Sequence, residues 1–188
     1  MASLDWKLLH SEYIHKSDWL TARKDRCLTP AGKIVDPYYV LEYPNWVNGL
    51  AIAEDGNVVM VRQYRQGFGK TFLEIPGGAM DPTDASPEVA MRRELLEETG
   101  YAFDQVIALG DICPNPASSN NVTYMFLATG GKKVQEQKLD QNEEIEIVII
   151  SMDELKQLLK ANGIRQALHV TCIYYALQHL ETTSLPQQ

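Results

Sequence analysis

Apolar residues along this chain fall mostly into short runs bounded by Gly, Pro, Asn or Asp, a pattern typical of β-strands. Asp55-Gly56 joins two of these runs and is a strong hairpin signal. The runs predict strands at residues 6–14, 19–28, 33–43, 47–53, 58–64, 71–75, 106–112, 122–128 and 145–150.

Helical start and stop signals predict three helices, at residues 87–98, from Ser151 to Gly163, and at 166–181. Ser151 and Glu154 form a capping box at the start of the second helix. The last helix is amphipathic, and the residues predicted to face the core are Leu168, Ile173, Leu177 and Leu180.

Pro44 divides the chain into two predicted parts. Residues 45–181 contain a mixed sheet with one helix after a Gly-Gly turn and helices at the end, which predicts an α/β fold arranged as an α/β/α sandwich. Residues 1–44 predict a small antiparallel N-terminal sheet, and residues 182–188 a disordered tail.

The N-terminal strands are too few to be stable alone, and their edges need to be covered. They also carry several aromatic side chains, which are Trp6, Trp19, Tyr38 and Tyr39. We therefore predict a homodimer in which this part packs on the partner subunit and borders the substrate.

Composition narrows the class of protein. At 188 residues, with 45% hydrophobic and 22% charged residues, the chain has the composition of a globular enzyme domain. A net charge of -8 without a Lys/Arg-rich run argues against nucleic-acid binding, and no segment is apolar enough to predict a membrane span or a signal peptide. Three widely separated cysteines indicate buried thiols in the cytoplasm rather than disulfides or a zinc site.

The helix predicted at 87–98 carries the strongest chemical signal. Ser86 is a good N-cap, Pro87 suits the first helical position, and Gly100 has the place of a left-handed C-cap. Capping residues therefore predict both the first and the last turn of this helix.

One face of this helix concentrates negative charge. Arg93, Glu97, Glu94 and Glu98 fall within roughly 140° of arc on a helical wheel. Glu94 and Glu98 repel each other at i,i+4, and acids near a helix C-terminus oppose the helix dipole, each at a cost of about 0.3 to 1 kcal/mol. This face could simply be a solvated acidic surface of the helix. A bound divalent cation would instead reverse the cost of gathering these charges.

The helix and the Gly-Gly turn before it resemble the Nudix box, written G-x5-E-x7-R-E-U-x-E-E-x-G-U with U an aliphatic or aromatic residue. The second half matches from Arg93 to Tyr101. In the first half Asp84 stands in the place of the first Glu, six residues after Gly78, and the interval from Asp84 to Arg93 is one residue longer. We interpret this as a loop insertion before Pro87, outside the acidic helix.

The resemblance covers roughly residues 44 to 180 and implies a Nudix hydrolase similar to the ADP-ribose pyrophosphatase subgroup, in which a small N-terminal sheet helps to form a dimer. It implies Mg²⁺ as the cofactor, with Mn²⁺ as a substitute. The implied metal ligands are the Gly77 carbonyl, Glu94, Glu97 and Glu98. Glu97 and Arg93 are also implied in catalysis, Glu97 by activating a water molecule and Arg93 by orienting Glu97.

Substrate contacts are implied on the strands before the Gly-Gly turn. Arg62 and Arg65 lie in a segment similar to one that contacts the diphosphate in the subgroup, with Arg65 the better candidate. Without that resemblance they would read as solubility charges on an edge strand. Glu74 is similar to the glutamate at the nucleotide side.

Two loops carry further candidates. Pro116, sixteen residues after Gly100, matches the place of a proline that accompanies activity on ADP-ribose, although Ala117 and the residues after it differ from the usual pattern. Without that match it would be an ordinary polar turn. Glu143 resembles a catalytic loop glutamate, with Glu144 as the alternative.

Aromatic side chains that could stack a base are Trp46, Tyr38 and Tyr39, although side chains of this kind more often belong to the core. The four histidines have no ligand spacing, so they predict no function.

Taken together, these residues predict Mg-dependent hydrolysis of the diphosphate bond of a nucleoside diphosphate linked to a sugar, such as ADP-ribose. The products would be a nucleoside monophosphate and a sugar phosphate. Two alternatives are a non-catalytic module that senses a nucleotide or ADP-ribose and a house-cleaning nucleoside triphosphatase. The first usually lacks these acids, and the second commonly lacks an N-terminal part of this length.

Overall fold

The structure is a computed structural model that describes residues 3–17 and 20–184. It consists of two compact units. The first contains Met1–Pro44 and Cys113–Val122, and the second contains Asn45–Ile112 and Thr123–Gln188. The boundary expected at Pro44 therefore coincides with the end of a unit, but the first unit also takes in a loop from the middle of the chain.

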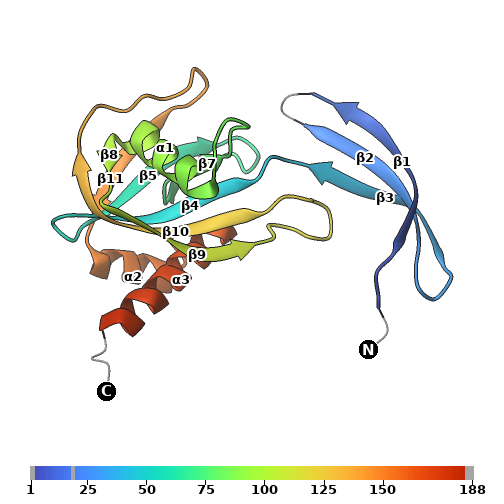
Figure 1. Cartoon of the computed structure of the whole chain (residues 1–188). Helices are drawn as coiled ribbons and strands as arrows, with labels where there is room; N and C mark the ends of the chain where they lie inside the picture. Colours follow the sequence, from blue (N-terminus) through green and yellow to red (C-terminus); the bar gives the residue numbers. More distant parts are fainter. Residues whose placement is uncertain (1–2, 18–19, 185–188) are drawn as a thin grey trace. The chain divides into compact units, whose positions relative to one another are not determined.

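The first unit is an antiparallel sheet of three strands in the order β1 (Lys7–Lys16), β2 (Thr21–Leu28) and β3 (Ile34–Glu42) (Figure 1). The loop Cys113–Val122 is bound to β3, because the Leu41 N–H donates to the Ser118 carbonyl at 2.7 Å and the Tyr38 hydroxyl donates to the Ala117 carbonyl at 2.5 Å. The small N-terminal sheet predicted from the sequence is thus confirmed. Residues 18–19, where the second strand was expected to begin, lie outside the described residues.

The second unit is built on a mixed sheet with the path β11-β5-β4-β10-β8, to which β6, β7 and β9 add by pairing with β5, β4 and β10. Strands β4 and β10 are parallel, and the other pairs are antiparallel. The strands are β4 (Trp46–Ala53), β5 (Val58–Arg65), β6 (Lys70–Glu74), β7 (Gly77–Ala79), β8 (Tyr101–Ala102), β9 (Gln105–Ile112), β10 (Thr123–Lys133) and β11 (Ile145–Ile150).

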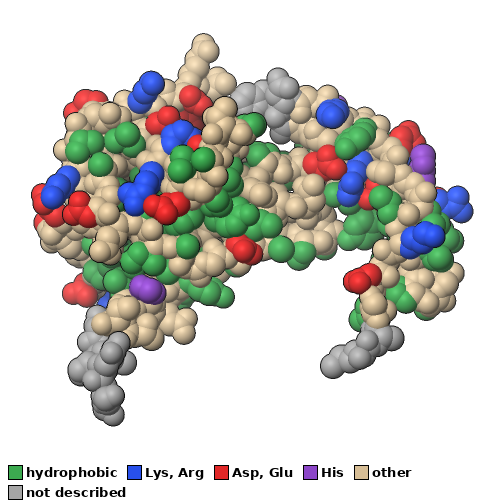
Figure 2. All heavy atoms as spheres, in the orientation of Figure 1, with side chains coloured by type: hydrophobic (Ala, Val, Ile, Leu, Met, Phe, Trp, Pro, Cys, Tyr) green, Lys and Arg blue, Asp and Glu red, His purple; other side chains and the backbone are tan. Residues whose placement is uncertain are grey.

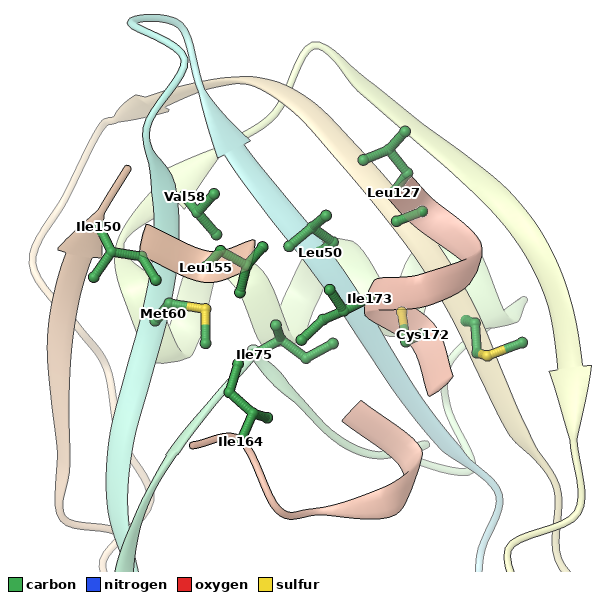
Figure 3. Packing of buried hydrophobic residues seen from close by; sticks show 12 residues of the cluster. Leu50, Val58, Met60, Ile75, Leu127, Ile150, Leu155, Ile164, Cys172 and Ile173 are labelled. Atoms are coloured by element: carbon green, nitrogen blue, oxygen red, sulfur yellow. The ribbon is translucent and has the colours of Figure 1, made fainter. Parts of the chain in front are cut away.

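Helices cover both faces of this sheet. Helix α1 (Pro87–Thr99) lies on one face, and α2 (Met152–Lys160) and α3 (Ala167–Ser184) lie on the other (Figure 1). Each face has its own buried cluster, and the one on the side of α1 contains Met91 and Leu95. Figure 3 shows the other cluster, to which Leu155 of α2 and Ile173 of α3 belong. The predicted α/β/α sandwich with a mixed sheet is therefore confirmed.

The structure differs from the sequence prediction in a few elements. Strands β7 and β8 were not expected, because three and two residues are too few to leave a pattern. Strand β10 continues past residue 128 because a register shift at Gly130, with φ 71°, lets the chain keep pairing. Helix α3 extends to Ser184, so residues 182–184 of the expected tail are helical, and the other four lie outside the described part of the chain.

The buried face of α3 agrees with the expectation in part, because Ile173 is buried and Leu177 and Leu180 pack against the core. The fully buried residues in this helix are His169, Cys172, Ile173 and Ala176, whereas Leu168, Leu177 and Leu180 are only partly buried. Of the three free cysteines, Cys27 and Cys172 are buried as expected, and Cys113 is exposed. Among the helices that the structure describes, none is long and apolar enough to cross a membrane.

Candidate active site

The second unit contains a pocket of about 620 Å³, a size typical of sites for small molecules. Its wall is formed by the starts of β4 and β10, by β5, β6 and β7, and by the segment that leads into α3. The lining residues with the chemistry of interest are Trp46, Asn48, Gln63, Arg65, Phe68, Phe72, Glu74, Gly77, Gly78, Glu98, Thr123, Glu143, Arg165 and His169.

Helix α1 begins and ends as the sequence predicts. The Ser86 hydroxyl accepts a hydrogen bond from the Val89 N–H at 3.2 Å, Pro87 is the first helical residue, and Gly100 closes the helix with φ 72°. These caps fix the ends of the helix, and Ala90, Met91 and Leu95 pack its inner face on the sheet. Its buried acids, Glu94 and Glu98, consequently face the Gly-Gly turn at β7.

Arg93 holds the acids of α1 in place. Its Nη1 donates to Glu94 at 2.8 Å and to Glu97 at 3.0 Å, while its Nε and Nη2 donate to the two carboxylate oxygens of Asp84 at 3.2 and 2.9 Å. Arg93 also lowers the pKa of Asp84 below its ordinary value. Despite the inserted residue and the shorter side chain, Asp84 therefore reaches Arg93.

The two buried acids lie where a negative charge is costly. Burial raises the pKa of Glu94 to about 7, although Arg93 lowers it, and Glu97 and Glu143 add repulsion. Burial likewise raises the pKa of Glu98 well above its ordinary value, against a hydrogen bond of 2.8 Å from the Gly77 N–H, and Glu94 and Glu143 again repel it. The carboxylates are thus close enough to raise one another's pKa.

Glycine is required at both positions of the turn. Gly77 has φ 156°, and a Cβ there would lie 2.3 Å from the Val47 carbonyl oxygen. A Cβ on Gly78 would lie 2.6 Å from a Glu94 carboxylate oxygen. The absence of side chains lets the Glu94 and Glu98 carboxylates approach the backbone of β7.

Within the described residues, no three His, Cys, Asp or Glu side chains converge in a metal-binding arrangement. The cause is visible in the contacts, since Arg93 engages Glu94 and Glu97 while the Gly77 N–H engages Glu98. The donors gathered here are nevertheless all oxygen atoms, which suit a hard divalent cation. Such an ion would also offset the repulsion between the buried carboxylates, so the residues fit a metal.

Arg65 and Glu74 form an ion pair at the pocket wall. Glu74 is fully buried, and the Arg65 guanidinium donates to it at 2.7, 3.1 and 3.3 Å, with the Gln63 amide at 3.3 Å. Glu74 is thus bound to the protein's own arginine. About half of the Arg65 side chain remains exposed to the pocket, but Glu74 offsets its charge.

Arg62 lies elsewhere, and its expected role at the diphosphate stays a prediction. It faces Glu146 across the β5–β11 pair, where its Nε donates to the carboxylate at 2.9 Å and its Nη2 forms a second contact. It does not line the pocket described above. Its side chain forms a cross-strand ion pair, an interaction that contributes to the stability of a sheet.

The remaining candidates divide between the two units. Trp46 and Glu143 line the pocket, whereas Glu144, the alternative loop acid, does not. The Glu143 carboxylate accepts a hydrogen bond of 3.1 Å from the Asp140 N–H within its own loop. Pro116 belongs to the first unit, in the loop bound to β3.

The structure also brings residues to the pocket that the sequence did not suggest. Arg165 lies between α2 and α3 with its guanidinium carbon 5.1 Å from the centre of the Phe68 ring, and no carboxylate partner among the described residues. Nothing in the sequence around Arg165 would have indicated that it lines the pocket. His169 could have been found, because it precedes Cys172, Ile173 and Ala176 at helical spacing and so belongs to the buried stripe of α3.

Charged residues outside the pocket are mixed in sign. On the face seen in Figure 2, acidic and basic side chains alternate over the second unit without a continuous basic patch. This agrees with the net charge of -8. Positive charge that could attract an anionic ligand to the pocket therefore comes from Arg65 and Arg165 of its lining.

Comparison with known proteins relates both units to the same kind of enzyme. A family model described as "NUDIX domain" matches residues 44–170, and a model described as "Nucleoside diphosphate sugar hydrolase N-terminal domain" matches residues 6–41.

Three individual proteins are similar over much of the chain. An "ADP-ribose pyrophosphatase" of Bacillus subtilis (strain 168) is 26% identical, with 96% of this chain and 95% of the relative aligned. A "Methanol dehydrogenase activator" of Bacillus methanolicus is 31% identical, with coverages of 74% and 78%. A solved structure titled "Crystal structure of ADP compounds hydrolase" has a TM-score of 0.85 at 20% identity, with 98% and 99% covered, which supports the fold.

Proposed function

Because this chain belongs to the NUDIX domain family, we propose that it hydrolyses the diphosphate bond of a nucleoside diphosphate linked to a sugar. ADP-ribose is the first substrate to test, and the products would be a nucleoside monophosphate and a sugar phosphate. The observation that carries the proposal is the pocket, which combines Glu98 of the acidic face of α1 with two arginines and an aromatic wall. The match of residues 6–41 to a nucleoside diphosphate sugar hydrolase N-terminal domain supports the same substrate class.

The acids of α1 would hold the metal ion, for which we propose Mg²⁺ with Mn²⁺ as a substitute. Glu94 and Glu98 supply buried carboxylate oxygens, Glu97 a more exposed one, and Gly77 a backbone carbonyl beside them. Bound there, a divalent ion screens the charge of the diphosphate and lowers the pKa of a coordinated water molecule. Arg93 keeps Glu94 and Glu97 oriented through its hydrogen bonds to both.

Proton transfer is assigned to Glu143, which borders the pocket, or to Glu97 of the acidic face of α1. Glu143 lies on its wall and is accessible, so it can accept the proton of the attacking water. Glu97 is the other candidate, since it is the most exposed of the three helix acids. Glu144 is the less favoured alternative because it does not line the pocket.

The opposite part of the pocket would bind the substrate. Arg165 has no carboxylate partner in the described part of the chain and can offer its guanidinium to a phosphate oxygen, while Arg65 contributes the donors that Glu74 leaves unused. Trp46 and Phe68 supply aromatic faces for a base. Pro116 keeps a proposed role in substrate preference, through the loop of the first unit.

The N-terminal sheet is proposed to form the dimer interface. All ten residues of β1 are exposed, and apolar side chains such as Leu8, Leu9, Tyr13 and Ile14 are each about half exposed. An exposed apolar strand is normally covered by another chain. The three free cysteines agree with the reducing cytoplasm as the proposed location.

The substrate class can be tested with a panel of nucleotides. ADP-ribose, other nucleoside diphosphate sugars, dinucleotides and nucleoside triphosphates would be incubated with the protein and Mg²⁺, and the phosphate products identified by chromatography. We expect the highest kcat/KM with a nucleoside diphosphate sugar. Preference for triphosphates would indicate the house-cleaning activity, and binding without turnover would indicate a sensor.

A further inference from the structure

The pocket contains a cluster of buried polar atoms that lack hydrogen-bond partners. They are the side-chain oxygen and nitrogen of Asn48, the Thr123 hydroxyl and Nδ1 of His169. Only 2%, 1% and 5% of these three residues is exposed, and all three line the pocket. None of them belongs to the acidic face of α1.

Three different elements bring these side chains together. Asn48 lies on β4 and Thr123 on the adjacent parallel strand β10, where Asn48 pairs with Met125 and Thr123 with Trp46. Side chains alternate along a strand, so Asn48 shares a face with Leu50 and Thr123 shares a face with Met125. Leu50 and Met125 both belong to the buried cluster under α3.

Helix α3 adds His169 to the same place. Cys172, one turn further along the helix, lies with its sulfur 3.8 Å from the Asn48 carbonyl oxygen. His169 precedes it by three residues on the same buried stripe. The three polar side chains therefore meet where the start of α3 covers β4 and β10, at the pocket wall.

Buried polar groups are almost always hydrogen-bonded, and one left without a partner costs about 1–3 kcal/mol. Unpartnered atoms on three residues of one pocket indicate a bound group that supplies the missing hydrogen bonds. That group must both donate and accept, because Asn48 presents a donor and an acceptor and the Thr123 hydroxyl can act as either.

The cluster favours a neutral group over an anion. Burial lowers the pKa of His169 to about 4, so the imidazole is uncharged at neutral pH. The charged groups next to it are Glu74 and Arg65, which offset each other. These neighbours leave no net charge at the cluster, which therefore matches a neutral group such as a hydroxyl.

The position of the cluster relative to the acidic helix favours a sugar over a base as the group bound there. Asn48 pairs across the sheet with Gly77, whose N–H donates to Glu98. The cluster is therefore adjacent to the acids that would bind the metal and the diphosphate. The group attached directly to a diphosphate in these substrates is a sugar, and the base lies one sugar further away.

We propose that Asn48, Thr123 and His169 form a subsite for the hydroxyl groups of a sugar attached to the diphosphate, and that this subsite contributes to substrate selectivity. The inference rests on the proposed hydrolase activity. The hydroxyls can come from the ribose of the nucleoside or from the second sugar, and substrate analogues distinguish the two sources.

The first test measures stability without substrate or metal. Thr123→Val removes an unpartnered hydroxyl at nearly constant shape, so its melting temperature should be higher than that of the wild type. Thr99→Val is the matched control, because this buried hydroxyl donates to the Leu95 carbonyl and accepts from the Tyr101 N–H at 3.1 Å. The control should melt at a lower temperature. A lower melting temperature for Thr123→Val would show that its hydroxyl already has a partner and would overturn the proposal.

The second test measures selectivity with Mg²⁺. The probes are ADP-ribose, the P-methyl ester of ADP, which lacks the second sugar, and ADP-ribose lacking the 2′ and 3′ hydroxyls of its adenosine. Thr123→Val should lose about three- to tenfold in kcat/KM on ADP-ribose, as expected for one neutral hydrogen bond, and Thr123→Ser should retain the wild-type value. The loss should disappear on the analogue that lacks the recognised hydroxyls, which identifies the sugar.

The outcomes separate this inference from the proposed function. If the wild type hydrolyses neither these probes nor any other nucleoside diphosphate sugar of the panel, the proposed function fails and the subsite fails with it. If the wild type hydrolyses ADP-ribose and Thr123→Val has the same kcat/KM ratios, the hydrolase activity stands and the subsite is wrong.

Discussion

At the scale of single residues, ionic contacts within the protein decide which charges remain for a ligand. The sequence contains Arg62, Arg65 and Arg93 near the acidic motif, and each of them is engaged by carboxylates of the chain. Arg165, which no motif indicates, is left facing the pocket beside Phe68. Residue type and spacing could predict the acids of α1, but not which arginine has a free guanidinium.

The variant Arg165→Ala tests whether the free guanidinium of Arg165 binds the substrate. Arg165 is exposed, so its removal should leave the melting temperature nearly unchanged and chiefly raise KM, with a loss of about 1.5 to 3 kcal/mol typical of a hydrogen bond to a charged group.

Arg65→Ala, by contrast, should lower the melting temperature as well, because it leaves the buried Glu74 carboxylate without its partner. Steady-state kinetics and thermal unfolding of both variants provide the check, with Lys156→Ala on the exposed side of α2 as the control. An unchanged KM in Arg165→Ala would exclude Arg165 from substrate binding.

At the scale of elements, helix α1 was predicted almost completely because its limits depend on local chemistry. Ser86, Pro87 and Gly100 determine its ends in sequence and in structure alike. The short strand β7 was not predicted, since it exists only because the Gly-Gly turn pairs with β4. That pairing needs the close approach of Gly77 to the Val47 carbonyl, a long-range contact that no sequence window contains.

The buried acids of α1 predict how stability depends on pH. The folded-state pKa of Glu94 is raised from 4.5 to about 7, so its contribution to stability is fully present below pH 4.5 and is lost as pH rises to about 7. The raised pKa of Glu98 acts in the same direction. Metal-free wild-type protein should therefore lose more stability over this interval than Glu94→Gln, as measured by thermal unfolding at a series of pH values.

Added Mg²⁺ supplies the control, because metal binding requires the ionised carboxylates and should stabilise the wild type more as pH rises. Equal pH profiles for the metal-free wild type and Glu94→Gln would contradict the raised pKa.

The loop before β11 predicts a contrast between two adjacent acids. Glu143 borders the pocket and Glu144 does not, so Glu143→Gln should lower kcat at least tenfold with little change in KM, while Glu144→Gln should remain near the wild type. Steady-state kinetics of the two variants decides which of the two acids acts in catalysis. The reverse result would assign the role to Glu144, and two active variants would leave Glu97 as the base.

At the scale of the whole molecule, the sequence predicted the layers of the second unit because hydrophobic runs and helix caps are local signals. Val58 to Val61 are all fully buried, as a continuous apolar run in a covered sheet should be. The sequence could not show that residues 113–122 join the N-terminal sheet, because the contact between Leu41 and Ser118 spans a large distance along the chain. The family resemblance related Pro116 to the substrate, and only the fold shows that Pro116 belongs to the first unit.

The exposed apolar strand β1 predicts a dimer. Light scattering at a series of concentrations should give the mass of two chains for the wild type. Replacing Leu8 and Ile14 by lysine should shift the protein toward the monomer while leaving the fold of the second unit intact, as judged by circular dichroism. A wild-type mass of one chain at all concentrations would contradict the proposed interface.

The central claim is that the acidic face of α1 supports metal-dependent cleavage of a nucleoside diphosphate sugar, and its most direct test is the rate of AMP and ribose phosphate formation from ADP-ribose. Wild-type protein should form the two products in equal amounts with Mg²⁺ and stop when the metal is chelated. Glu98→Gln should lower turnover by roughly two orders of magnitude or more, because it removes a charged oxygen ligand at constant shape. Without metal it should be no less stable than wild type, because it removes a costly buried charge. Near-wild-type turnover of Glu98→Gln in saturating Mg²⁺ would contradict the account.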